Sequence, residues 1–137
     1  MASPALKQPR TAHEVSHTII SAAMKVHSGL GPGLLESTYE ACLAYELRQG
    51  GARVEAQVSL PVVDRGIKLD VGYRIDLLVE DLVIVELKSI DAIAPIHEAQ
   101  LLSYLKLSDK SLGLIINFNV VHLKDGIKRM VRGRNWK

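Results

Sequence analysis

The apolar run Leu82–Leu87 constrains the fold of this 137-residue chain more than any other segment. It is aliphatic nearly throughout, and only Glu86 interrupts it before Lys88 follows. Side chains alternate between the two faces of a strand, so a strand that is apolar at successive positions is buried on both faces. The run therefore predicts the central strand of a sheet that is covered by other elements on each side.

A second buried strand is predicted at Leu112–Phe118, and a helix from Ile96 to Leu107 lies between the two strands. Pro95 suits the first turn of that helix, where a missing N–H group costs nothing. A strand, a helix and a second strand in this order imply a parallel, right-handed crossover.

The other elements follow from their hydrophobic periods. A capping box at Thr11-Ala12-His13-Glu14 opens a first helix that ends near Gly29, and helical spacing continues across Leu34–Gln49. Further strands are expected at Val54–Leu60, at Ile67–Val79 with a bend at Gly72, and at Ile127–Val131 after a hairpin-type turn at 124–126. The predicted order is ααβββαββ, an α/β fold with a mixed sheet flanked by helices.

Length and composition predict one globular domain. Hydrophobic residues make up 47% of the chain and charged residues 23%, which is enough apolar surface for a core. We expect this domain to span residues 11–131, between a loose tail at 1–10 and a basic tail at 132–137. Cys42 is the only cysteine and no apolar stretch is long enough to span a bilayer, so we expect a cytoplasmic protein that does not contact membranes.

Two carboxylates and a lysine interrupt the strand sequence at Asp76, Glu86 and Lys88. Glu86 and Lys88 are two residues apart and point the same way, and hairpin pairing brings Asp76 near them. With the carbonyl of Leu87, the two acids suit a hard divalent cation, which lowers the pKa of a bound water and stabilises charge on a phosphate. Lys88 can orient that water or accept its proton. The pattern indicates phosphodiester hydrolysis.

Three polar residues on the predicted helices extend this hypothesis. Gln100 and Tyr104 are four residues apart, so they share one helix face and can hydrogen-bond the phosphate, the nucleophilic water or Lys88. Glu36 opens the second helix and is a candidate acidic ligand, directly or through water.

Each group also has a simpler interpretation, which the residues alone leave open. The two strand acids and the lysine can form a structural salt-bridge cluster. The polar pair on the later helix can belong to an ordinary exposed face, and Glu36 can be favoured by the positive end of the helix dipole.

Basic residues crowd the last part of the chain, at Lys124, Lys128, Arg129, Arg132, Arg134 and Lys137. Such a cluster suits a polyanion such as a nucleic acid. A solvated tail that aids solubility explains the same residues equally well.

With these motifs in place, the chain resembles the PD-(D/E)XK nuclease superfamily, with Asp76 as the first acid and Glu86-Leu87-Lys88 as the E-x-K element. Gln100 and Tyr104 are similar to the Q-x-x-x-Y motif of the RecB-type branch. The stretch Gly33–Tyr39 resembles the signature of a small bacterial family, the GxxExxY proteins. Stretches at 99–105, 113–118 and 124–129 are similar to that family as well, so the resemblance covers nearly the whole chain.

The resemblance implies a restriction-endonuclease-like core and magnesium-dependent cleavage of nucleic acid, with DNA as the expected substrate and Mn²⁺ as a substitute for Mg²⁺. The superfamily also contains binding proteins that have lost activity, so a nucleic-acid-binding module of the same fold is the alternative. A single domain of this size covers little of a duplex, and we therefore expect a homodimer or a partner protein.

Overall fold

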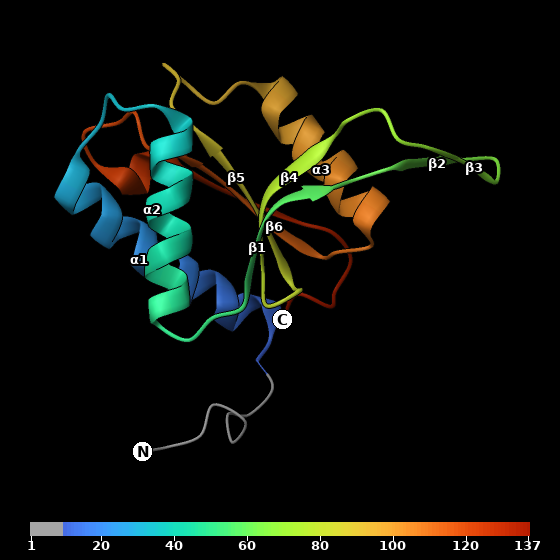
Figure 1. Ribbon diagram of the computed structural model, residues 1–137, viewed down its shortest axis with the longest axis horizontal. Helices are drawn as coiled ribbons and strands as arrows, with labels where there is room; N and C mark the ends of the chain where they lie inside the picture. Colours follow the sequence, from blue (N-terminus) through green and yellow to red (C-terminus); the bar gives the residue numbers. More distant parts are fainter. Residues whose placement is uncertain (1–9) are drawn as a thin grey trace.

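A computed structural model describes residues 10–137, and its centre is a five-stranded mixed sheet with helices on both faces (Figure 1). The strand order is β1-β4-β5-β6-β7, in which β5 and β6 are parallel and the other neighbours are antiparallel. The five strands are β1 (Val54–Ser59), β4 (Arg74–Val79), β5 (Val83–Lys88), β6 (Leu112–Asn117) and β7 (Ile127–Val131). The predicted mixed sheet is confirmed, and so is the burial of its two central strands, β5 and β6.

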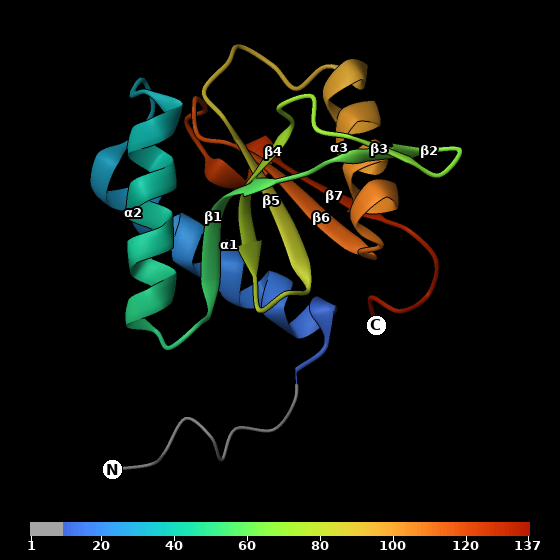
Figure 2. The ribbon, with the colours of Figure 1, turned by 45° about the vertical axis from the view of Figure 1, so that its right-hand side comes forward.

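Helices α1 (Ala12–Leu30) and α2 (Glu36–Gln49) cover one face of the sheet, and α3 (Pro95–Ser108) covers the other (Figure 2). The larger core lies under α1 and α2 and includes Tyr39 and Phe118. The smaller core lies under α3 and includes Tyr104. Within residues 10–137, no helix combines the length and apolar character needed to cross a membrane.

The capping box predicted at the start of α1 is present. The Thr11 hydroxyl accepts a hydrogen bond from the Glu14 N–H (3.1 Å), and the Glu14 carboxylate accepts one from the Thr11 N–H (2.9 Å). Both bonds satisfy amides that the helix leaves without partners.

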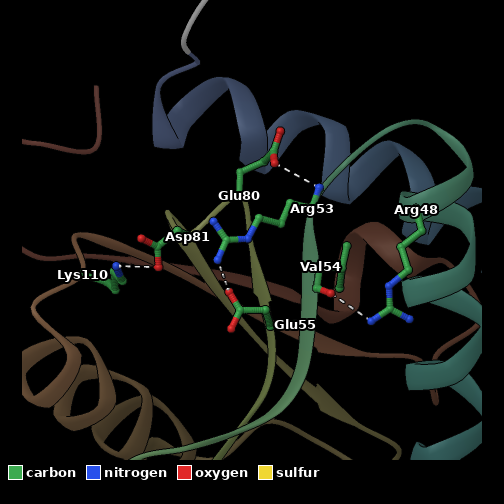
Figure 3. A network of polar contacts seen from close by, with 7 residues as sticks. All are labelled: Arg48, Arg53, Val54, Glu55, Glu80, Asp81 and Lys110. Atoms are coloured by element: carbon green, nitrogen blue, oxygen red, sulfur yellow. Dashed lines mark hydrogen bonds and ion pairs between the residues drawn. The ribbon is translucent and has the colours of Figure 1, made fainter. Parts of the chain in front are cut away.

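A three-residue connection, residues 80–82, sets how β4 and β5 pair. Glu80 and Asp81 both have φ of 55°, the left-handed conformation, the Leu82 N–H donates to the Val79 carbonyl (3.0 Å), and Val79 pairs with Val83 across the connection. Glu80 is also held in place, because its N–H donates to the Arg53 carbonyl (2.8 Å) and its carboxylate accepts from the Arg53 N–H (3.0 Å) (Figure 3). The register that follows from this turn sets Asp76 opposite Glu86.

The predicted strand Ile67–Val79 is divided into two elements, which corrects the sequence prediction. Its first part is β3 (Ile67–Leu69), which pairs with β2 (Val62–Asp64) in a separate two-stranded ribbon. Its second part is β4 in the main sheet. A bend was predicted at Gly72, and this residue, with φ of 86°, lies between the two parts. The ribbon projects away from the body of the molecule (Figures 1 and 2).

The hairpin-type turn predicted at 124–126 is instead part of a short 3-10 helix, η2 (Leu123–Gly126). A Cβ at Gly126 would lie 2.2 Å from the Asn117 carbonyl oxygen, so only glycine allows this close approach. After β7, the chain returns to α1, where the Trp136 carbonyl accepts a hydrogen bond from the His13 N–H (2.8 Å). The predicted tail 1–10 falls outside the described residues except for Arg10.

Candidate active site

Asp76 and Glu86 face each other across β4 and β5, and each carboxylate binds the backbone of the opposite strand. Glu86 Oε2 accepts a hydrogen bond from the Asp76 N–H (2.9 Å), and Asp76 Oδ2 accepts one from the Leu87 N–H (2.8 Å). Main-chain pairing between these strands is present from Leu77 to Val79, so the side chains replace it at this end. The two acids are thereby held side by side in fixed orientations.

The orientation of Asp76 depends on a change of face in both β1 and β4. Val54 and Leu77 belong to the core under α1 and α2, whereas Val58 and Ile75 belong to the core under α3. Residues separated by an even number normally share one face of a strand. The change is centred on Gln57 in β1, whose φ is 53°, and on Asp76, which lies opposite it in the β1–β4 register.

Gln57 and Glu40 belong to the same polar cluster, although neither residue was predicted from the sequence as part of the site. The Gln57 side-chain amide donates to Glu40 Oε1 (2.6 Å) and lies 3.4 Å from Asp76 Oδ1. The sequence contained a signal for Glu40, because this acid follows Glu36 by one helical turn and therefore shares its helix face. Gln57 had none, because a polar residue at that position fits the alternation of an ordinary strand.

Glu86 is a buried acid with a strongly perturbed ionisation. Its exposed fraction is 6%, and this burial raises the pKa of its carboxyl to about 8. The Asp76 charge adds to the rise, while Lys88 opposes it. Burial also raises the pKa of Glu40, against the hydrogen bond from Gln57, and the charges of Asp76 and Glu36 raise it further. Ionising these acids together is therefore unfavourable, and a cation bound between them would relieve the repulsion.

Lys88 ends β5 and is half-buried beside these acids. Among the ion pairs formed by residues 10–137, none involves Lys88, Asp76 or Glu86. The salt-bridge cluster that the sequence left open is not formed in this structure. The Lys88 ammonium group therefore has no paired carboxylate among residues 10–137.

Gln100 and Tyr104 approach the acids from α3. The Gln100 amide donates to the Tyr104 hydroxyl (3.1 Å), and Tyr104 is buried except for 6% of its surface. Burial raises the pKa of the Tyr104 hydroxyl, and the charges of Glu86, Tyr73 and Asp76 contribute to the rise. The ring of Tyr73 lies 6.1 Å from that of Tyr104, measured between centroids.

The Glu36 side chain is exposed at the first residue of α2 and forms no hydrogen bond or ion pair within the described part of the chain. A hydrogen bond from the Ser89 hydroxyl to the Leu34 carbonyl (2.6 Å) joins the end of β5 to the segment before α2. Glu36 therefore lies just after a segment that is tied to the end of β5, and its side chain does not contact Asp76 or Glu86.

Tyr39 is buried and stabilises the segment that precedes α2. Its hydroxyl donates to the Gly31 carbonyl (2.5 Å) and accepts from the Leu34 N–H (3.1 Å), and its ring stacks on Phe118 at 4.4 Å. These contacts close the Gly31–Leu35 loop and fix where α2 begins.

The donor set fits a hard divalent cation that keeps several waters. Between residues 10 and 137, no three His, Cys, Asp or Glu side chains form a group that could hold an ion alone. Mg²⁺ is usually bound by one or two carboxylates, with waters and substrate phosphates as further ligands, so the Asp76–Glu86 pair is sufficient. The Leu87 N–H points at Asp76 on β4. The carbonyl of a strand residue points towards the same neighbouring strand as its N–H, so the Leu87 carbonyl also points towards β4.

Comparison with known families identifies the class of this chain. The family model described as PD-(D/E)XK nuclease superfamily matches residues 13–130. The chain therefore belongs to the PD-(D/E)XK nuclease superfamily, and its mixed sheet between helices is the restriction-endonuclease-like fold of that superfamily. Searches of curated proteins and of solved structures give no significant match.

Proposed function

We propose that this protein is a magnesium-dependent nuclease that hydrolyses phosphodiester bonds in DNA. The observation that carries the proposal is the side-by-side pair of Asp76 and Glu86, with Lys88 unpaired on the same strand as Glu86. Two adjacent acids, one of them buried with a raised pKa, form a site that a divalent cation would stabilise. Membership of a nuclease superfamily supports the reaction class.

In the proposed site, Asp76, Glu86 and the Leu87 carbonyl hold Mg²⁺, with Mn²⁺ as a substitute, and Glu36 supports it through water. When bound, the ion would lower the pKa of a water and stabilise charge on the scissile phosphate. Lys88 would position the attacking water or accept its proton. As the water oxygen bonds to phosphorus, the P–O bond to the leaving oxygen would break, and that oxygen would take up a proton from Lys88 or from solvent.

Residues of α3 and α2 complete the proposed arrangement. The Tyr104 hydroxyl, which accepts from the Gln100 amide, can turn its proton towards a phosphate oxygen or the attacking water. Glu40 lies within the same cluster through Gln57 and is a further candidate for binding a metal-bound water.

The proposal also includes the subfamily and the superfamily branch of this chain, its binding partner and its location in the cell. Gly33, Glu36 and Tyr39 support membership of the GxxExxY group, and Gln100 with Tyr104 supports the RecB-like branch. We expect nucleic acid as the binding partner and the cytoplasm as the location.

Purified full-length chain incubated with single- and double-stranded DNA tests the function directly. We expect cleavage with Mg²⁺ or Mn²⁺ and none with a chelator. Lys88→Ala should lose at least about 100-fold, the scale typical of removing a general base, and Asp76→Asn should lose a similar factor because it removes a charged metal ligand. Asp76→Asn keeps a carbonyl oxygen to accept the Leu87 N–H, so the local fold is preserved.

The matched control is Lys110→Ala, which removes a lysine at the opposite end of β5, where Lys110 pairs with Asp81. Cleavage that persists unchanged in both site variants would exclude the proposed site. Salt-sensitive DNA binding without cleavage under any metal would favour the alternative, a binding module of the same fold.

A further inference from the structure

The β2–β3 ribbon carries exposed aliphatic side chains along one face. Ile67 and Leu69 of β3, and Val71 just beyond its end, keep 61%, 46% and 58% of their surface exposed, although they alternate in sequence as in a half-buried strand. A two-stranded ribbon with three residue pairs is marginally stable in water by itself. A partner that pairs with the edge of β3 would extend the ribbon to four strands and stabilise it.

We propose that the partner is a second copy of this chain, and that the free edge of β3 pairs antiparallel with β3 of the other copy about a two-fold axis at Leu69. The resulting four-stranded sheet has the order β2-β3-β3-β2. This inference concerns assembly and does not rest on the proposed nuclease activity.

The turn of the ribbon decides which backbone groups are available for this pairing. Arg65 and Gly66 both have positive φ, at 48° and 80°, and Asp64 pairs with Ile67 on either side of them. In a two-residue hairpin of this type, that closing pair exchanges both backbone hydrogen bonds, so the next pair, which includes Lys68, does not. The Lys68 N–H and carbonyl therefore point outwards from the free edge of β3.

The side chains of the same segment are self-complementary. The sequence Ile67-Lys68-Leu69-Asp70-Val71, paired antiparallel with itself about Leu69, sets each Lys68 opposite Asp70 of the other copy. It also sets Ile67 opposite Val71, and Leu69 opposite Leu69. The outward-pointing backbone N–H and carbonyl of each Lys68 then fall at hydrogen-bonded positions between the two β3 strands. The two Leu69 residues fall on the axis, at a non-hydrogen-bonded position where the backbones are closer.

Charge complementarity distinguishes this edge from one that is protected against pairing. An isolated lysine on an edge strand discourages association. Asp70 follows Lys68 by two residues, just beyond β3, so the proposed pairing extends β3 by one residue and places both side chains on one face. The antiparallel register then replaces lysine–lysine repulsion with two ion pairs. One Asp70 oxygen accepts the Gly72 N–H (3.3 Å), which leaves the other oxygen for the partner's lysine.

Sedimentation equilibrium of the full-length chain at low salt, over a range of concentrations, tests the proposal. We expect a monomer–dimer equilibrium. Lys68→Glu and Asp70→Lys each replace two attractive cross-strand pairs with two repulsive ones, so each should raise the dissociation constant roughly tenfold. The double variant K68E/D70K restores the pairs and should return the constant to within about threefold of the original.

Two further variants separate this interface from general effects of charge and folding. Lys124→Glu makes the same change of charge at an exposed residue outside the ribbon, and the dissociation constant should not change. Leu69→Lys sets two ammonium groups on the two-fold axis, and dimers should no longer form. Recovery in the double variant also shows that both substituted side chains are compatible with a folded ribbon.

Three results would overturn the proposal. The first is a chain that stays monomeric at the highest concentration reached. The second is a dimer whose dissociation constant is unaffected by Lys68→Glu and Leu69→Lys, because the interface would then lie elsewhere. The third is a double variant that is as weak as the single ones.

Discussion

At the scale of single residues, Glu86 couples the site to the stability of the fold. Its carboxyl has an ordinary pKa of 4.5 and a pKa of about 8 in the folded chain, chiefly through burial and then through the charge of Asp76. The folded state therefore holds this proton more tightly than the unfolded state does. The stabilisation linked to it is complete below about pH 4.5 and is lost as the pH rises towards 8.

Glu86→Gln should therefore remove this loss of stability at alkaline pH. In the presence of a chelator, we expect the variant to exceed the original chain in free energy of unfolding at pH 9 by on the order of a few kcal/mol, and to match it near pH 4.5. Glutamine keeps the oxygen that accepts the Asp76 N–H. Urea unfolding across the pH range measures the difference.

The control for this prediction is Glu55→Gln, which changes a half-exposed glutamate on β1. It should leave the pH dependence as it was. A Glu86→Gln variant with the same alkaline decline as the original chain would contradict the assigned ionisation.

At the scale of elements, the contact between α3 and β6 determines where Gln100 and Tyr104 lie. A Cβ at Gly113 on β6 would come within 2.7 Å of Leu101 Cδ1 on α3. Leu101 follows Gln100 directly, so a displacement of this helix also moves the polar pair of the site. Gly113 is thus a packing requirement that the hydrophobic pattern of the strand did not reveal.

Gly113→Ala should destabilise the fold by about 1–3 kcal/mol, because a methyl group is forced into a filled core. Leu101→Ala removes the obstructing atoms, so the double variant should lose less stability than the sum of the two single losses. Gly29→Ala is the matched control, since its Cβ meets nothing within 4 Å and alanine favours the helix. Equal denaturation midpoints for the two glycine variants would contradict the packing argument.

At the scale of the whole molecule, the C-terminal segment packs against α1. Trp136 is partly buried against the larger core, and the Arg129 guanidinium lies 5.4 Å from its ring centroid. Several of the basic residues are also engaged within the chain, since Lys128 pairs with Glu98 and Arg132 pairs with Asp109. These contacts engage basic residues for which the sequence left two interpretations equally open, a polyanion-binding cluster and a solvated tail.

Trp136→Ala should lower the thermal midpoint by several degrees, because it removes apolar contacts and a cation–π interaction worth about 2 kcal/mol together. Arg134→Ala, in the same segment, is exposed and should leave the midpoint within a degree or so. Scanning calorimetry compares the two. A segment that contributes nothing would give equal midpoints.

The secondary structure, the sheet and part of the candidate site could be predicted from the sequence alone. The hydrophobic periods predicted the helices, the mixed sheet and the buried β5 and β6, and residue types at strand ends predicted Asp76, Glu86 and Lys88 as neighbours. These features are local, or follow from one short turn, so they can be derived from the order of residues.

Only the tertiary structure decided the rest, because it depends on long-range pairing and burial. Gln57 and Glu40 enter the polar cluster only through the β1–β4 register and the position of α2. The raised pKa of Glu86 requires its neighbours and its depth. The same is true of the ribbon: the sequence predicted a strand from Ile67, but only the divergence at Gly72 released β3 from the main sheet and left its edge free.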